Sequence, residues 1–182
     1  KGIPTYLRPF AYGHARGAAF WTVVTRATGT PIDRIMRPYV DQPGVPVVSI
    51  ETRCTGATTA VALHQEKFEG VLGSNASRTS PLWSIPVCFA TAAGAAPRCE
   101  ILDRRDSGTS LPGCPATVFA NPNGRGYYLS EYSPETVRAL GTRARATLTS
   151  SERLSLLGDT WWLARAGRRD VGAYLDLASS LA

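Results

Sequence analysis

Apolar positions change their spacing twice along the chain, from helical to alternating and back to helical. Over residues 1–41 they recur every three or four positions, which predicts three short helices. Residues 43–133 carry short alternating runs separated by turns rich in glycine, proline and asparagine, a pattern typical of β-strands. After Ser133 the helical spacing returns. The sequence therefore predicts a β-rich centre flanked by helices on both sides.

The first change of spacing falls in the stretch YVDQPGVPVVSIETR, residues 39–53. Its QPG stops the preceding helix, because proline and glycine both interrupt regular helical structure. Beyond it, Val48 and Ile50 alternate with Ser49 and Glu51, so the two pairs point to opposite faces of an extended chain. This join predicts a helix that ends directly before a strand with one buried face.

Turn residues define the expected helix boundaries in the N-terminal part. Gly29 is suited to end the second helix, because glycine readily adopts the left-handed conformation found at helix C-termini. Thr30 is expected to cap the third helix, with Pro31 at the first helical position, where the fixed φ of proline fits. Pro38 is expected to kink or shorten this helix, because it lacks a backbone N–H.

The central part predicts a small antiparallel β-sandwich of the Ig-like kind, because short strands follow one another at close spacing. After the first strand, the expected strands are residues 59–68, 82–92, 98–105, 116–122 and 126–132. The sequence DSGTSLPG, residues 106–113, is interpreted as a turn, and NPNGRG, residues 121–126, as a hairpin loop. Trp83 is interpreted as a core residue of the sandwich rather than as a platform for carbohydrate.

Three features define the C-terminal helices. Ser133 precedes Pro134 and is expected to cap the first of them, and Thr149 and Glu152 have the spacing of a capping box for the second. Gly167 is placed to end that second helix. The apolar faces expected for the last two helices are Leu154, Leu157 and Trp161 in one, and Val171, Tyr174, Leu175, Ala178 and Leu181 in the other.

Charge and hydropathy exclude some classes of protein. The chain of 182 residues has a net charge of +6 and a pI of about 9.5, and lysine occurs only at Lys1 and Lys67. Its arginines are scattered, without the basic stripe and interleaved aromatic residues of a nucleic-acid interface, so no nucleic-acid partner is expected. No run of eighteen apolar residues occurs, so no membrane span is expected.

The four cysteines are Cys54, Cys88, Cys99 and Cys114. None forms a Cys-x-x-Cys pair, which argues against a zinc ribbon, and four are few for a disulfide scaffold of this length. They are therefore expected to be free and to pack as small apolar residues, with a Cys99–Cys114 pair across a hairpin as the alternative. Asn75 begins an Asn-Ala-Ser sequon, which matters only in a secreted eukaryotic protein.

Candidate chemistry is sparse. HQEKF at His64 has phenylalanine where a zinc helix needs its second histidine, and His14 lies late in the first expected helix. Neither a Gly-x-Ser-x-Gly elbow nor a persuasive carboxylate pair occurs; Asp103 and Asp106 stand among arginines, as at a charged strand end. No catalytic, cofactor-binding or metal-binding residue is therefore assigned to this chain.

Four sequence motifs nevertheless indicate a family. The most specific are Q-P-G-x-P-V-V at 42–48 and W-x-I-P-V at 83–87. G-Y-Y-L-x-x-Y at 126–132 and S-S-E-R-L-x-L-L-x-D at 150–159 support them. In this order the motifs resemble those of the zinc aminopeptidases of the aminopeptidase N (membrane alanyl aminopeptidase) type. The resemblance covers nearly the whole chain and implies membership of this family of zinc-dependent metalloprotease hydrolases.

The resemblance implies that residues 1–42 are the last helices of a catalytic metallopeptidase domain, residues 43–133 its β-sandwich domain, and residues 134–182 the start of a helical C-terminal domain. The zinc helix, the third glutamate ligand, the Gly-x-Met-x-Asn motif and the catalytic tyrosine of the family have no match here. Tyr6 and Tyr12 do not stand in the context of that tyrosine.

The implied role is that of a non-catalytic fragment, a spacer or scaffold between the other domains of a parent enzyme that removes N-terminal residues from peptides. Zinc and peptide substrates are implied for the parent alone, and this chain is expected to be inactive by itself. A cytoplasmic location is favoured if the parent is bacterial. The alternative is a stand-alone Ig-like module for protein interaction.

Overall fold

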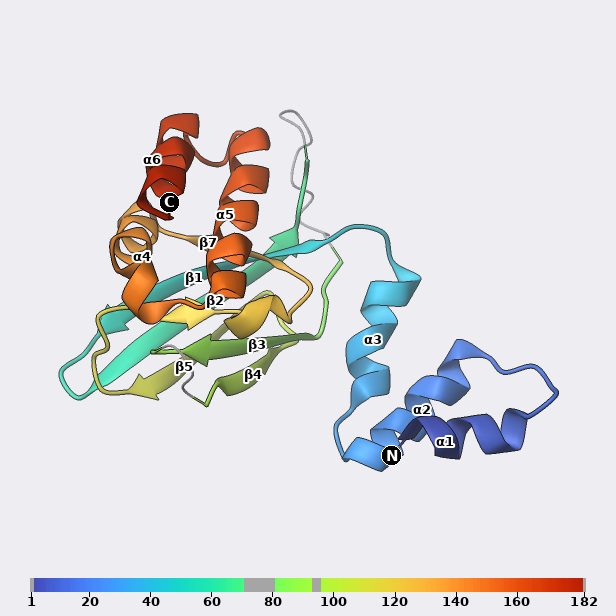
Figure 1. Ribbon diagram of the computed structural model, residues 1–182. Coiled ribbons are helices and arrows are strands. Elements are labelled where there is room, and N and C mark those ends of the chain that lie inside the picture. Colours follow the sequence, from blue (N-terminus) through green and yellow to red (C-terminus); the bar gives the residue numbers. More distant parts are fainter. Residues whose placement is uncertain (1, 71–80, 93–95, 182) are drawn as a thin grey trace. The chain divides into compact units, whose positions relative to one another are not determined.

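The computed structural model describes residues 2–70, 81–92 and 96–181, and Asn75 lies outside them. The chain divides into two units, residues 1–43 and residues 44–182 (Figure 1). Helices stand at both ends of the chain and two β-sheets between them. This confirms the mixed α and β class that the hydrophobic spacing predicts, while the Ig-like topology stays a prediction.

The first unit is helical. Its elements are α1 (Gly2–Leu7), the short 3₁₀ helix η1 (Arg8–Phe10), α2 (Gly17–Thr28) and α3 (Ile32–Asp41). Gly29 ends α2 with a φ of 69°, as expected from its freedom to adopt left-handed geometry. His14 lies in the connection between η1 and α2, not late in the first helix, because that helix is much shorter than its apolar spacing indicates.

The start of α3 differs from the expectation. Pro31, not Thr30, is the N-cap residue and makes no side-chain cap. The backbone N–H of Asp33 instead donates to Oγ1 of Thr25 in α2, and that hydroxyl lies 3.1 Å from Oδ1 of Asp33. Pro38 is accommodated inside the helix, which continues to Asp41. A partner from the preceding helix thus supplies the cap that the local sequence lacks.

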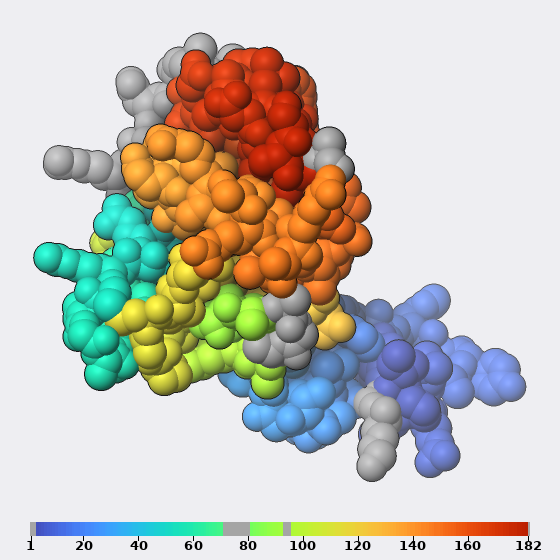
Figure 2. Space-filling model, turned by 60° about the vertical axis from the view of Figure 1, so that its left-hand side comes forward, coloured from blue at the N-terminus to red at the C-terminus, as the bar shows by residue number. Residues whose placement is uncertain are grey.

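The second unit contains two sheets, whose strands are β1 (Pro46–Cys54), β2 (Thr58–Lys67), β3 (Ile85–Ala90), β4 (Arg98–Leu102), β5 (Asp106–Pro112), β6 (Phe119–Ala120) and β7 (Leu129–Tyr132). The first sheet has the order β5-β2-β1-β7 and the second the order β4-β3-β6. The C-terminal helices gather at one side of this unit, and β3 and β4 lie at the other side (Figures 1 and 2).

Two segments that the sequence assigns to turns have other structures. Residues 106–112 of the first segment form the whole of β5, which pairs with β2 although its sequence is mostly polar and contains glycine. NPNGRG is not a hairpin loop, because β6 belongs to the second sheet and β7 to the first. The segment crosses between sheets, and Asn121 and Asn123 adopt positive φ values of 64° and 59° within it. The expected local turn chemistry is correct there, but the pairing it implies is wrong.

The first sheet is not wholly antiparallel, in contrast to the expected sandwich. β1 pairs antiparallel with β2 but parallel with β7, with Val48 opposite Ser130. Two strands joined by a tight hairpin must pair antiparallel. β7 is reached from β6 in the other sheet and not through a hairpin from β1, so it can pair parallel with β1.

Apolar side chains from both sheets form the core, and one polar side chain lies among them. Trp83 is only 1% exposed, which agrees with its interpretation as a core residue. Gln65 of β2 is fully buried, and its Oε1 accepts the N–H of Trp83 at 2.9 Å. Its Nε2 lies 3.0, 3.2 and 2.9 Å from the carbonyl oxygens of Trp83, Leu102 and Arg104. Gln65 therefore links a strand of the first sheet to the backbone around β3 and β4.

Three helices follow the sheets: α4 (Pro134–Thr147), α5 (Ser150–Arg165) and α6 (Val171–Leu181). Ser133 caps α4, and Thr149 and Glu152 form the expected capping box at the start of α5. Gly167 follows α5 with a φ of 71°. Gly141 allows α4 and α6 to approach closely, because a Cβ there would lie 2.6 Å from Oγ of Ser180.

The buried faces of α5 and α6 differ from those expected. In α5, Leu154 is 70% exposed and Trp161 is 42% exposed, while the buried residues are Glu152, Leu156, Asp159, Thr160, Leu163 and Ala164. In α6, Leu177 is buried, whereas Val171 and Leu175 are more than half exposed. The apolar spacing predicted the wrong buried face for α5, because the face that packs inward includes polar residues that form specific hydrogen bonds.

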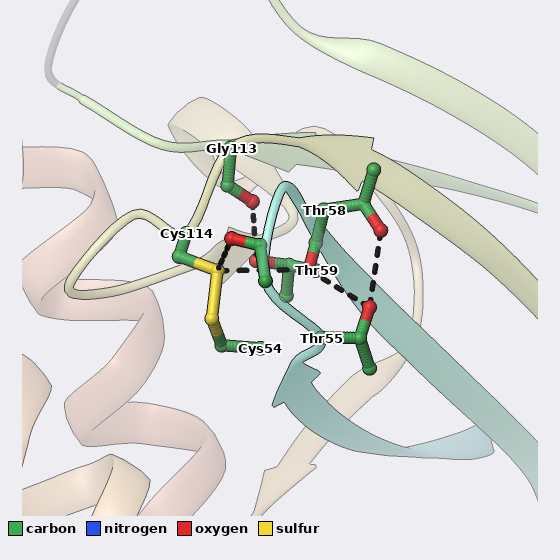
Figure 3. Close-up of a disulfide and its surroundings, with 7 residues drawn as sticks. Cys54, Thr55, Thr58, Thr59, Gly113 and Cys114 are labelled. Atoms are coloured by element: carbon green, nitrogen blue, oxygen red, sulfur yellow. Dashed lines mark hydrogen bonds between the residues drawn. A yellow bond between two sulfur atoms is a disulfide. The ribbon is translucent and has the colours of Figure 1, made fainter.

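The expectation of free cysteines is wrong. Cys54 bonds to Cys114 and Cys88 to Cys99, and the Cys99–Cys114 alternative does not occur. Cys88 and Cys99 oppose each other directly on β3 and β4. Cys54 ends β1, and Cys114 follows β5 (Figure 3). Sequence spacing could not find the Cys54–Cys114 pair, because β5, which brings Cys114 to the end of β1, has the sequence of a turn.

Replacing Gln65 with leucine is expected to lower the free energy of unfolding by about 3 kcal/mol, because the change leaves several buried backbone groups without a partner. Urea unfolding measures the loss. Glu51→Gln, on an exposed position of the neighbouring strand, is the control and is expected to change stability by less than about 0.5 kcal/mol. Equal stabilities for Gln65→Leu and the wild type would contradict the linking role of this side chain.

Candidate interaction surface

The described residues gather no metal site. Within residues 2–70, 81–92 and 96–181, no group of three His, Cys, Asp or Glu side chains is placed to hold a metal ion. Nδ1 of His64 lies 2.6 Å from Oδ1 of Asp106, but this pair is at the surface of the first sheet. These side chains do not fit a zinc site, so no zinc-dependent step is assigned to them. Among the described helices, none combines the length and apolar character of a membrane span.

The glycine of the G-Y-Y-L-x-x-Y motif has a packing role. A Cβ on Gly126 would overlap the ring of Tyr128, so a larger residue does not fit without movement. The backbone of Gly126 also pairs with the side chain of Asn121, which accepts its N–H at 2.5 Å and donates to its carbonyl at 3.1 Å. These contacts shape the crossing between the two sheets.

The last tyrosine of the same motif joins the sheets. Tyr132 of β7 is buried, and its hydroxyl accepts the N–H of Ala120 in β6 at 2.8 Å. Its hydroxyl also lies 3.3 Å from the carbonyl oxygen of Ala120. Burial raises the pKa of this phenol well above its ordinary value, so the hydroxyl keeps the proton it can donate.

The acidic residues of the S-S-E-R-L-x-L-L-x-D motif fasten α5 to the sheets. Glu152 accepts the N–H of Asn123 at 3.2 Å besides completing the capping box of its own helix. Asp159 is buried and accepts the N–H of Ser130 in β7 at 3.0 Å. Burial raises the pKa of Asp159 to about 7, although hydrogen bonding to Ser130 opposes the rise.

Arg168, in the turn after α5, joins the end of this helix to two strands. It donates to Glu131 of β7 at 2.6 and 3.0 Å and lies 2.5 Å from Glu66 of β2, so it spans β1 between them. Burial alone would raise the pKa of Glu131, but hydrogen bonds from Arg168 and Ser49 and the nearby arginine charges hold it below its ordinary value. Arg169 adds a hydrogen bond to the carbonyl of Tyr132.

An apolar surface pocket of about 400 Å³ lies beside the elements that these contacts join. Its lining comes from the residue before β1, the residue after β2, the segment that leads into β7, and α5: Val45, Phe68, Gly126, Tyr127, Tyr128, Leu129 and Trp162. The rings of Phe68 and Trp162 meet edge to face with centroids 6.5 Å apart. The guanidinium of Arg165 lies 5.1 Å from the centroid of Trp162. We call this feature the aromatic pocket.

The aromatic pocket is a candidate interaction surface, because exposed apolar patches commonly mark interfaces. Tyr127 is 66% exposed and Trp162 is 46% exposed, so both present large apolar areas. Trp161 stands next to Trp162 but faces elsewhere, with its ring 5.1 Å from that of Tyr174 in α6. The sequence did not reveal this pocket, although two of the quoted motifs, at 42–48 and 126–132, contribute to its lining, because sequence order does not show which motifs meet.

Comparisons with known proteins bear on these motifs. Residues 117–182 match the family described as ERAP1-like C-terminal domain. The chain is 25% identical over 97% of its length to "Probable aminopeptidase 1" of Sulfurisphaera tokodaii. It is 26% identical over its whole length to "Puromycin-sensitive aminopeptidase" of Caenorhabditis elegans and to "Glutamyl aminopeptidase" of Sus scrofa.

The share of each relative that is matched is small. The chain covers 21% of the Sulfurisphaera protein and 20% of each of the other two. The chain is therefore related to the aminopeptidases along nearly its whole length and spans about a fifth of the relatives it matches. This confirms the resemblance that the motifs indicate, while the aminopeptidase N type in particular stays a prediction.

The pH dependence of stability is expected to report on Asp159. Its pKa is higher in the folded chain than the ordinary 3.8, so between about pH 4 and 7 the folded state keeps a proton that the unfolded state releases. Asp159 therefore makes stability fall as pH rises across this window, by on the order of 2–4 kcal/mol. Asp159→Asn keeps an acceptor for Ser130 but does not titrate, so it should gain stability relative to wild type as pH rises.

Urea unfolding at pH 4 and pH 7.5 measures this difference. Asp176→Asn, on the exposed side of α6, is the control and is expected to follow the wild type at both pH values. If Asp159→Asn and the wild type differ by the same amount at both pH values, the burial of an ionisable Asp159 is contradicted.

The aromatic pocket is expected to bind a hydrophobic fluorescent dye in the purified chain. Trp162→Ser should lower the dye fluorescence more than Trp161→Ser, because only Trp162 lines the pocket. The two positions are similarly exposed, so they form a matched pair. Equal losses for the two variants would show that dye binds elsewhere.

Proposed function

We propose that this chain is a non-catalytic part of a longer zinc-dependent aminopeptidase of the aminopeptidase N type, and that it acts as a spacer between the other domains. The observation that carries the proposal is that residues of the family-like motifs make structural contacts between parts of the fold. Gly126, Tyr132, Glu152 and Asp159 make contacts that fix one part of the fold to another. None of them gathers with other residues into a described metal site.

Three parts of the longer protein would be joined. Residues 1–42 would be the last helices of the catalytic domain, residues 43–133 the sandwich domain and residues 134–182 the start of the helical C-terminal domain. The division of the chain after Pro43 supports the first boundary. The helices after Ser133 support the second, since they lie within the match to the ERAP1-like C-terminal domain.

Exposed apolar surface supports a role in joining domains. In the first unit, Ile35 is the one buried apolar residue among those described, whereas Ile3, Leu7 and Val40 are more than half exposed. In the second unit, the aromatic pocket and the outward residues of α5 and α6 are also accessible. The remaining domains of the same polypeptide are the partners that would cover these surfaces, because helices with uncovered apolar faces need such contacts.

Catalysis would belong to the rest of the longer protein. Zinc there would polarise the peptide carbonyl and activate a water molecule. The names of the relatives are the basis for assigning removal of N-terminal residues to that protein, with peptides as substrates. This chain would contribute rigidity, because its fastened helices and sheets hold the joined domains at a fixed spacing.

The purified chain is expected to bind less than one zinc ion per molecule and to hydrolyse no aminoacyl amide when zinc is added. Metal analysis after dialysis and a fluorogenic aminoacyl-amide panel measure this, with a zinc aminopeptidase as the positive control. Zinc-dependent turnover by the chain would contradict its non-catalytic role.

The coding sequence upstream of Lys1 tests the parent independently. A continuous reading frame with Gly-x-Met-x-Asn, His-Glu-x-x-His and a later glutamate is expected. A start codon directly before Lys1, without these motifs, would contradict the proposed parent and favour the stand-alone interaction module.

A further inference from the structure

Each sheet of the second unit has an edge strand that is fixed by a disulfide. β5 is an edge of the first sheet, and the Cys54–Cys114 bond joins the segment after it to the end of β1. β4 is an edge of the second sheet, and the Cys88–Cys99 bond joins it to β3. The first bond spans a sequence separation of 60 residues and the second a separation of 11.

The two edge strands lie beside each other. Oγ1 of Thr109 in β5 donates to Oε1 of Glu100 in β4 at 3.1 Å, so the disulfides act on the same side of the unit. At the opposite edge of the first sheet, β7 is held by α5 through Asp159 and by Arg168. The edge at β7 is thus held by contacts with α5 and Arg168, and the edges at β4 and β5 are held by disulfides.

β5 has little else in its own sequence to hold it. Asp106 and Gly108, of residue types depleted in strands, lie in its first three positions, and Leu111 is its one buried residue. Its end is fixed near the disulfide, where Oγ1 of Thr59 donates to the carbonyl of Gly113 at 2.9 Å (Figure 3). The N–H of Gly113 also donates to the carbonyl of Ala57 at 2.9 Å. The cross-link therefore stabilises a strand whose sequence favours a turn.

We infer that this protein folds in an oxidising compartment and that the β4–β5 edge depends on both disulfides. Formation of each bond converts two thiols into one disulfide and transfers two electrons and two protons to a disulfide-donating oxidoreductase, whose own disulfide becomes a dithiol. Cys54, Cys99 and Cys114 belong to exposed positions, where a reducing cytosol would act on them. The inference replaces the cytoplasmic location favoured from sequence for a bacterial parent.

The first experiment determines the redox state in the cells that produce the protein. Cells are quenched in acid, free thiols are alkylated under denaturing conditions, and the digested protein is analysed by mass spectrometry with and without reduction. No alkylation before reduction is expected, together with linked peptides for Cys54–Cys114 and Cys88–Cys99. Four alkylated thiols would overturn the oxidising compartment, and other pairings would overturn the fastening of the two edges.

The second experiment measures what each bond holds. In Cys54→Ser/Cys114→Ser, amide hydrogen exchange over residues 107–111 is expected to accelerate at least tenfold, while residues 130–132 of β7 stay protected. The matched variant Cys88→Ser/Cys99→Ser should accelerate exchange in β4 instead. Each is expected to lower Tm by roughly 5–10 °C. If a variant does not fold, exchange in the wild-type chain before and after reduction, which opens both bonds, tests whether β4 and β5 depend on the two bonds together.

Unchanged exchange in β5 after loss or reduction of Cys54–Cys114 would overturn the dependence of this edge on the bond. Neither experiment measures zinc or peptidase activity, so the inference can fail while the proposed spacer role stands. The reverse also holds, since a stand-alone interaction module with these disulfides would give the same exchange results.

Discussion

The buried side chain of Gln65 is the contact on which the arrangement of the two sheets depends. It belongs to β2 of the first sheet, yet its polar atoms are satisfied by the backbone of Trp83, Leu102 and Arg104 around β3 and β4. A buried amide is costly unless all its groups find partners, so this side chain fixes one register between the sheets. Apolar packing alone would tolerate small shifts that these hydrogen bonds do not.

The same principle holds α5 against the sheets. Asp159 and Glu152 reach backbone N–H groups in β7 and in the crossing segment, while Arg168 pairs with carboxylates of two strands. Such contacts are specific in direction, because donors and acceptors must meet at set distances. These few polar contacts hold the helices and the sheets together. Apolar surface, including the aromatic pocket, therefore stays accessible for other contacts.

The motifs that indicate the relationship to aminopeptidases are therefore intelligible as packing requirements. Gly126 stands where a Cβ would meet the ring of Tyr128, and Tyr132 reaches from one sheet to the other. The proposed role as a spacer would need such features, because domains joined through a loose link would not keep a fixed spacing. The disulfides add the same rigidity at the edge that the helices leave uncovered.

The sequence by itself determined that a β-rich centre lies between helical ends, the caps at Ser133 and Thr149, the end of α2 at Gly29 and the burial of Trp83, because these follow from local propensity and hydrophobic spacing. The tertiary structure alone decided that residues 106–112 form a strand, that β7 runs parallel to β1, that the cysteines pair and that α5 turns Asp159 inward. Each of these depends on partners distant in sequence. The aromatic pocket was hidden for the same reason, since its walls come from four separate segments.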